Sequence, residues 1–99
     1  MAAGHFSLEL EINDFPQNAR WKVTQKSTIK SLCELHGVVI TARGTYVGPG
    51  KHLRVGDRKL YLQIEGPTER AARQAKADIK AIIEEHTEKA LMAGSRYQM

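Results

Sequence analysis

The sequence predicts a two-layer α+β domain in which a three-stranded sheet carries three helices on one face, in the order β-α-α-β-β-α. Two patterns predict this fold. Residues 7–13 and 58–65 alternate between apolar and polar side chains, as half-buried strands do, and the C-terminal part carries one apolar stripe at helical spacing. The 99 residues are enough for one domain with a modest core. We expect this domain to span residues 7–93, between flexible segments at 1–6 and 94–99.

The two alternating segments separate their side chains by face. The apolar positions, which we expect to point to the core, are Leu8, Leu10, Ile12, Leu60, Leu62 and Ile64. The positions expected on the opposite face are Glu9, Glu11, Asn13, Tyr61, Gln63 and Glu65. Because three of the latter are carboxylates, the open face of the sheet is predicted to be acidic and to disfavour phosphate binding.

Two short helices are expected after the first strand. Asp14 is placed to cap the first helix, over residues 16–23. Ser27 is placed to cap the second, over residues 28–35, and Gly37 is expected to end it.

The second half of the chain predicts two strands and a long helix. Residues 38–43 are mostly β-branched or apolar and form the middle strand in sequence order. Residues 44–57, with four glycines and one proline, form a loop before the last strand. The last helix opens after Gly66-Pro67, and Gly94 is expected to end it. Its apolar stripe consists of Ala72, Ala75, Ile79, Ile82, Ile83, His86 and Ala90.

The net charge of +4 is unevenly distributed. Residues 1–15 carry a net charge of −3, residues 16–59 carry +7, and residues 60–99 are neutral. A concentrated basic segment is what a polyanionic partner selects, and a solvated basic surface is the alternative. The charge distribution by itself leaves both open.

Several classes of function are disfavoured by the residues present. No apolar run reaches the ~20 residues of a membrane helix, and the N-terminus lacks the layout of a signal peptide. The single cysteine, Cys33, indicates a reducing intracellular compartment; a core thiol is a better interpretation of it than a nucleophile with His36. Residues 44–52 fail as a phosphate loop, because their glycine spacing is too long and His52 stands where a magnesium-binding hydroxyl belongs. The four histidines lack metal-ligand spacing, so we expect no metal, no cofactor and no enzymatic activity.

The link between the first two helices resembles that of a type I KH domain, whose glycine loop is followed by Thr-Ile-Lys. Thr28-Ile29-Lys30 matches those three residues. The four loop positions then fall on Val23, Thr24, Gln25 and Lys26, none of which is glycine. The resemblance implies the KH fold. The β-branched Val23 implies that the usual backbone clamp on phosphates is lost, because glycine is what permits a close approach.

The chain is more specifically similar to the degenerate KH-like domain at the C-terminus of the spliceosomal branch-site DEAD-box RNA helicase family. The matching pieces are Leu10 to Gln17, Ala19 to Thr24, Ile40 to Tyr46, Pro49 to Lys51, Arg58 to Leu62 and Ser95 to Tyr97. This resemblance implies a nuclear, non-catalytic module that acts in pre-mRNA splicing. It also implies that the module is an accessory domain, detached from a much longer catalytic region that precedes it. Its implied partners are single-stranded RNA or ribonucleoprotein and spliceosomal proteins, with no membrane partner, and we expect it to be a monomer.

In a KH-like arrangement the RNA-contacting side chains would border one groove along a basic edge. The candidates are Arg20, Lys22, Lys26, Lys30, Arg43, Tyr46, Lys51 and Arg54. Lys26 would offer a point charge in place of the clamp, which predicts salt-sensitive contact of low sequence specificity. We interpret Ile29 and Ile40 as core rather than as a floor for bases, and Trp21 as a core anchor rather than a stacking residue.

A protein-interaction module is the alternative function. A KH-like fold that has lost its clamp is free to present its surface to another protein. Either the open sheet face around Tyr61 or the long last helix would then form the interface.

Overall fold

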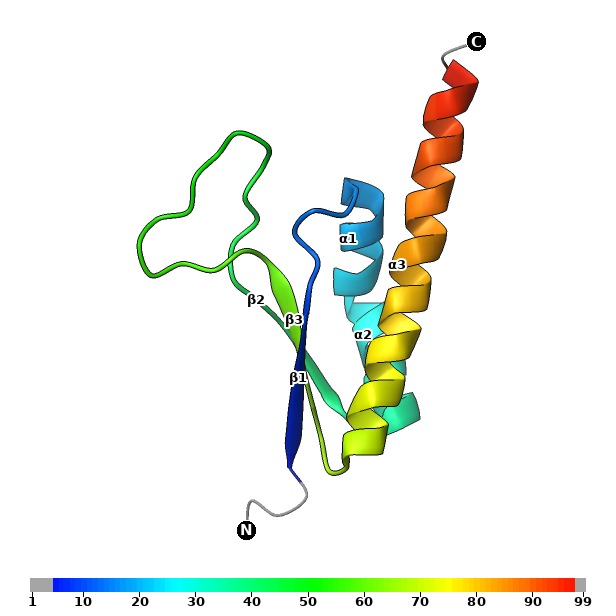
Figure 1. Ribbon diagram of the computed structural model, residues 1–99. Coiled ribbons are helices and arrows are strands. Elements are labelled where there is room, and N and C mark those ends of the chain that lie inside the picture. Colours follow the sequence, from blue (N-terminus) through cyan, green and yellow to red (C-terminus); the bar gives the residue numbers. More distant parts are fainter. Residues whose placement is uncertain (1–4, 98–99) are drawn as a thin grey trace.

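The computed structural model describes the backbone of residues 5–97 and the side chains of residues 5–92. Its elements are β1 (Phe6–Glu11), α1 (Gln17–Thr24), α2 (Lys26–His36), β2 (Val39–Arg43), β3 (Tyr61–Gly66) and α3 (Glu69–Tyr97). This order and the three-stranded sheet confirm the predicted α+β class. In Figure 1 the helices lie together on one side of the sheet, and the long β2–β3 loop extends away from the helices.

The sheet has the strand order β1-β3-β2, and both strand pairs are antiparallel. Leu8 lies opposite Ile64, which in turn lies opposite Ile40, so one row of apolar side chains crosses the sheet on its helical face. Ile40 and Ile64 are buried in the core, and Ile29 of α2 packs against it. The interpretation of Ile29 and Ile40 as core residues is therefore confirmed.

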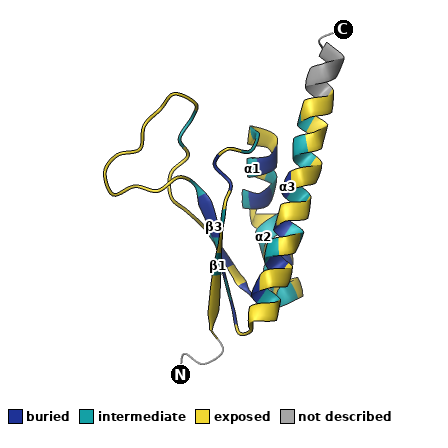
Figure 2. Cartoon of the chain, viewed as in Figure 1, coloured by how far each residue is buried: buried dark blue, intermediate teal, exposed yellow. Residues whose placement is uncertain are grey.

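Helix α3 covers the sheet with small and branched side chains at intervals of three and four residues. Ala72, Ala75, Ile79 and Ile83 are buried, and Figure 2 shows the buried positions of α3 on the side that faces the rest of the domain. The helix continues to Tyr97, past Gly94, so the predicted stop is wrong. A glycine inside a helix lowers helix stability by about 1 kcal/mol relative to alanine. It ends the helix where its backbone adopts the left-handed conformation.

The predicted helix caps are also wrong. The N-cap of α1 is Pro16, and no side chain caps it. Asp14 instead accepts a hydrogen bond from Asn13 Nδ2 at 3.1 Å. The N-cap of α2 is Gln25, again without a side-chain bond, so Ser27 lies inside the helix rather than at its start.

The end of α2 is as predicted. Gly37 has φ of +67°, and its N–H donates to the carbonyl oxygen of Cys33 at 2.8 Å, which satisfies one of the last helical carbonyls. Cys33 is half-buried and packs against the core. In the described part of the chain, no helix combines the length and the apolarity needed to cross a bilayer.

Candidate nucleic-acid interface

The junction between α1 and α2 leaves no loop for a phosphate clamp. Only Gln25 separates the two helices, with φ of −64° and ψ of 138°. Val23 is 1% exposed, and Lys26 is already the first residue of α2. Thr24 Oγ1 donates back to the Arg20 carbonyl at 2.8 Å, which closes the last turn of α1. The four positions that correspond to the glycine loop therefore form a tight helix-to-helix junction.

The two ends of the β2–β3 loop are held against each other at its base. The Thr45 N–H donates to the Arg58 carbonyl at 2.8 Å, and Thr45 forms a parallel bridge with Lys59. Gly44 has φ of +81°, and a Cβ placed there would lie 2.5 Å from the carbonyl oxygen of Lys59. Only glycine fits this approach, so the loop closes at this point and fixes the backbone of Lys59.

A buried asparagine ties the same loop to the turn between β1 and α1. Asn13 Nδ2 donates to the Val47 carbonyl at 2.9 Å, and the Val47 N–H donates to Asn13 Oδ1 at 2.8 Å. The prediction that Asn13 faces outward is wrong, because it is only 3% exposed. Strand β1 ends at Glu11, so its alternation no longer applies, and Ile12 and Asn13 are both buried.

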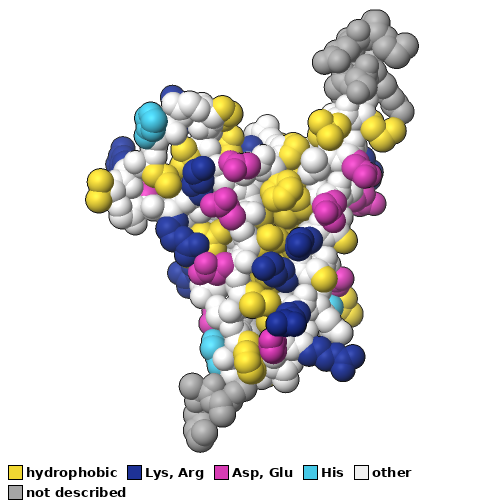
Figure 3. Space-filling model, in the orientation of Figure 1, with side chains coloured by type: hydrophobic (Ala, Val, Ile, Leu, Met, Phe, Trp, Pro, Cys, Tyr) yellow, Lys and Arg dark blue, Asp and Glu magenta, His cyan; other side chains and the backbone are white. Residues whose placement is uncertain are grey.

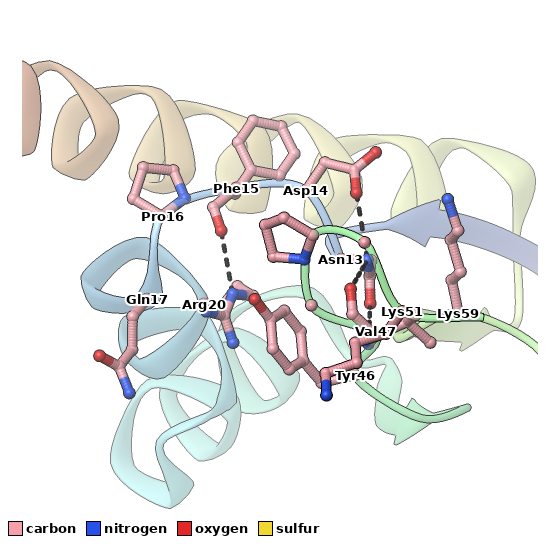
Figure 4. Close-up of a pocket in the computed structure, with 13 residues that line it drawn as sticks. Asn13, Asp14, Phe15, Pro16, Gln17, Arg20, Tyr46, Val47, Lys51 and Lys59 are labelled. Carbon is pink, nitrogen blue, oxygen red and sulfur yellow. Dashed lines mark hydrogen bonds between the residues drawn. The ribbon is translucent and has the colours of Figure 1, made fainter. Parts of the chain in front are cut away.

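Arg20 and Tyr46 make a third connection, between α1 and the loop. Arg20 Nε donates to the Phe15 carbonyl at 2.9 Å, which fixes the guanidinium plane. Its central carbon lies 3.8 Å from the centroid of the Tyr46 ring, a cation–π arrangement that Figure 4 shows. Tyr46 remains 44% exposed. Arg20 thus holds the aromatic ring at the surface rather than burying it.

These three connections surround a pocket of about 570 Å³, which is in the size range of small-ligand sites. One wall is the β1–α1 turn with the start of α1, and the other is the base of the β2–β3 loop (Figure 4). Its cationic lining residues are Arg20, Lys51 and Lys59, and Asp14 is the carboxylate that lines it. Within residues 5–92, no carboxylate forms an ion pair with any of these three cations. The pocket therefore carries an excess of positive charge.

Three of the eight predicted RNA-contacting residues meet in this pocket: Arg20, Tyr46 and Lys51. Arg54 lines an adjoining hollow on the loop together with Tyr46 and Lys51. Two residues that sequence reasoning did not select, Asn13 and Lys59, help to form the pocket. An asparagine directly after an alternating strand was the available signal for Asn13, because such side chains often bond to nearby backbone in turns.

The other predicted cations lie elsewhere on the surface. Lys22, Lys26 and Lys30 belong to α1 and α2 and line neither hollow, and Arg43 is exposed at the end of β2. Figure 3 shows Lys and Arg side chains over the β2–β3 loop and also along α3. The positive charge is therefore not confined to one edge, and in the pocket it lies beside the exposed ring of Tyr46.

Trp21 is not a core residue. It is 60% exposed, because α1 directs Ala19 and Val23 into the core and position 21 falls on the opposite side of the helix. The prediction of a core anchor is therefore wrong, and this large apolar side chain lies on the surface.

The open sheet face is covered at its centre. Arg58 pairs with Glu9 through two hydrogen bonds, at 2.9 and 3.2 Å, and its guanidinium carbon lies 3.8 Å from the centroid of the Tyr61 ring. Tyr61 is consequently only 9% exposed. The hydrogen bond from Arg58 holds the pKa of the Glu9 carboxyl below its ordinary value, and the same bond raises the pKa of Arg58. At the far end of this face His5 lies 2.9 Å from Glu65.

The fold and the pocket define a small α+β domain that presents a cationic, aromatic-lined hollow beside its first helix. In residues 5–92, no three His, Cys, Asp or Glu side chains gather as a metal site would require. The KH-domain family model matches residues 6–89, and the chain belongs to this family. The KH resemblance of the sequence is thereby confirmed.

The similar curated proteins are DEAD-box RNA helicases. The chain is 52% identical over 87 residues to DEAD-box ATP-dependent RNA helicase 42 of Oryza sativa subsp. japonica, a match that covers 88% of the chain. It is 51% identical over 83 residues, or 84% of the chain, to DEAD-box ATP-dependent RNA helicase 45 of Arabidopsis thaliana. It is 53% identical over 77 residues, or 78% of the chain, to the probable ATP-dependent RNA helicase DDX46 of Homo sapiens. The matched region spans about 8% of the length of each of these relatives.

Proposed function

We propose that this domain is a non-catalytic RNA-binding module of a splicing-associated ATP-dependent RNA helicase. It tethers that enzyme to single-stranded RNA or ribonucleoprotein in the nucleus. Family membership and about 50% identity to segments of DEAD-box RNA helicases support the assignment to a helicase. The activity would belong to the much longer remainder of such a protein, and this domain would supply an additional contact to its substrate.

The observation that carries the proposal is the meeting of Arg20, Tyr46 and Lys51 in one hollow. Unpaired cations attract phosphates, and an exposed aromatic ring provides a stacking surface for a base. Without the glycine loop, this domain lacks the backbone amides with which KH domains bind phosphates, so the affinity for RNA is expected to be weak. Binding of phosphates by side-chain cations releases counterions, so the contact is expected to be sensitive to salt. Such contacts carry no base information, so low sequence specificity is also expected.

Filter binding of a single-stranded RNA dodecamer to the 99-residue chain, repeated over a series of potassium chloride concentrations, tests this proposal. We expect measurable binding at low salt and a steep loss as the salt concentration rises. A triple variant, K51Q with R54Q and K59Q, should weaken binding, because it removes three charges from the pocket and from the hollow that adjoins it.

A matched control removes three charges from α3 through K76Q, K80Q and K89Q. It should retain most of the affinity, although its net charge equals that of the first variant. Dissociation constants weaker than about 1 mM at low salt for the unmodified chain would remove the RNA-binding function.

A protein-interaction module is the second candidate, and one observation favours it. Leu91 and Met92 are exposed on the C-terminal part of α3, at 66% and 62%, where that helix has passed the buried stretch that ends at Ile83. Such side chains are typical anchors of protein interfaces. The covered Tyr61 makes the sheet face a poorer candidate. Amide shifts confined to α3 on addition of a spliceosomal protein, with no shift on addition of RNA, would support this function instead.

A further inference from the structure

The two ends of α1 differ in what they offer to a nucleic acid. Its C-terminal end meets α2 at the tight Gln25 junction, where the buried Val23 leaves no room for a phosphate. Its N-terminal end borders the cationic pocket, which Gln17 and Arg20 help to line. The helix has 8 residues. At 1.5 Å per residue, it separates the two places by about 12 Å.

We propose that the pocket between the β1–α1 turn and the base of the β2–β3 loop binds one nucleotide of a single-stranded RNA. The phosphate lies among Arg20, Lys51 and Lys59, and the base stacks against Tyr46. This inference rests on the proposed RNA-binding function and assigns its main contact to one site. The contact has thus moved by one helix length, away from the position that corresponds to the glycine loop.

The charges support a phosphate as the anion in this pocket. Arg20 uses Nε to bind the Phe15 carbonyl, while its two terminal nitrogens have no bonding partner among residues 5–92. These nitrogens form a planar fork, which suits two oxygens of one phosphate. Lys51 and Lys59 add two mobile charges, and Asp14 offsets one. The remaining excess of two suits one or two phosphodiesters rather than a long run of them.

The aromatic ring supports a base as the second part of the ligand. Tyr46 stands at the pocket wall with its ring held by Arg20 and with 44% of its surface exposed. A base that follows the bound phosphate can stack on the remaining surface of the ring. Stacking on an aromatic ring tolerates every base, so this site binds RNA without selecting a sequence.

The pocket is also preorganised. The paired bonds of Asn13 with Val47 fix one side of the loop, and the close contact of Gly44 with the Lys59 carbonyl fixes the other. Because these connections exist in the free protein, binding pays little for ordering the loop base. Residues 52–58 are exposed and do not line the pocket, whereas Lys59 does.

Amide shift mapping locates the contact without altering the protein. The isotopically labelled chain is titrated with a mixed-sequence single-stranded RNA octamer. We expect the largest shifts at residues 13–17, 20, 45–51 and 59, and small shifts at residues 24–30. The largest shifts at residues 24–30, with residues 13–17 and 45–51 unmoved, overturn the inference and leave the proposed function intact.

Two variants separate the phosphate contact from the base contact. K59Q should weaken RNA binding several-fold and lower the slope of log affinity against log salt by about 0.7, the value for one phosphate on a single strand. Y46L should weaken binding about tenfold, the equivalent of one lost stacking contact, without changing that slope. K76Q on α3 is the matched control for K59Q and should leave the affinity nearly unchanged.

Tyr46 also supports the loop, so its variant needs a structural check. Y46F keeps the ring and should retain the affinity. The amide signals of Thr45, Val47 and Lys59 in free Y46L should match those of the unmodified chain, which distinguishes lost stacking from a general loss of loop structure. Unmodified affinity in both K59Q and Y46L overturns the pocket assignment while RNA binding itself stands. Absence of RNA binding by the unmodified chain overturns both the pocket and the proposed function.

Discussion

Asn13 and Val47 exchange two hydrogen bonds across 34 residues of sequence, and both bonds are shorter than 3.0 Å. The buried side-chain amide of Asn13 offers one donor and one acceptor to the loop. It therefore pairs with Val47 in the way that the backbone of a neighbouring strand would. The bonds place the β2–β3 loop beside the β1–α1 turn and create one wall of the pocket. The position of the loop thus depends in part on this one side chain, beside the Arg20–Tyr46 contact and the Thr45–Arg58 hydrogen bond.

The variant N13A tests this dependence. It removes both bonds and leaves the Val47 amide and carbonyl unpaired near the core, so we expect a loss of about 1–3 kcal/mol in the free energy of unfolding. Urea denaturation measures this loss. N18A is the matched control, because Asn18 makes one exposed bond, to the His86 carbonyl. Equal effects of the two variants would contradict the role given to Asn13.

Two glycines of the loop predict different costs for the same substitution. Gly44 and Gly50 both have positive φ, of +81° and +76°. At Gly50 an added methyl group meets nothing within 4 Å. G50A should therefore lower the free energy of unfolding by about 1–2 kcal/mol, the cost of placing alanine in the left-handed conformation.

At Gly44 the methyl group would also lie 2.5 Å from the Lys59 carbonyl oxygen, so G44A should cost distinctly more and should open the base of the loop. Urea denaturation gives the two free energies, and amide shifts at Thr45 and Lys59 report the opening. A larger cost for G50A than for G44A would count against the close approach.

The exposure of Trp21 makes a spectroscopic prediction. It is the only tryptophan, so intrinsic fluorescence reports on this position alone. We expect a long-wavelength emission maximum in the folded state, with acrylamide quenching nearly as strong as in urea, because the ring is 60% exposed. Strong protection from acrylamide in the folded chain would contradict this placement.

Stability measurements check the same feature. W21A should change the free energy of unfolding by less than about 0.5 kcal/mol, as is usual for exposed sites. The buried Ile79 provides the contrast, since I79A should cost about 2–5 kcal/mol.

The Glu9–Arg58 pair predicts a pH dependence. The pKa of Glu9 is lowered in the folded protein, so its contribution to stability is present above the unfolded pKa and is lost as the pH falls through the folded pKa. The stability difference between the unmodified chain and E9Q should therefore be largest near neutral pH and should shrink below about pH 4.

Urea denaturation at several pH values measures this difference. Both side chains are about half exposed, so the effect should be small. E34Q is the control, because Glu34 forms no ion pair within residues 5–92. A difference for E9Q that stays constant with pH would argue against the pair.

The fold class could be predicted from the sequence, because burial of one face gives apolar residues the period of the strand or helix that carries them. Alternation at Leu8, Leu10, Leu62 and Ile64 identified the inner face of the sheet, and the stripe on α3 identified the helix that covers it. Local cap signals were less reliable. Asp14 was recruited by Asn13 instead of capping α1, and neither short helix has a side-chain cap.

The site was predicted only in part, for two physical reasons. The large apolar side chain of Trp21 predicts a core position, although its spacing of two residues from both Ala19 and Val23 indicates the opposite helix face. Lys59 owes its place in the pocket to the bridge with Thr45, a contact that depends on how the loop closes. No periodicity encodes such a contact, so nothing in the sequence distinguishes Lys59 from its neighbours.

The β2–β3 loop combines a base that is fastened at three points with a tip, residues 52–57, that is exposed throughout. None of residues 52–57 lines the pocket. The tip around the fully exposed Val55 is therefore a suitable place to insert a peptide epitope or to attach a fluorophore, so that the domain can be followed in an extract while the pocket stays unaltered.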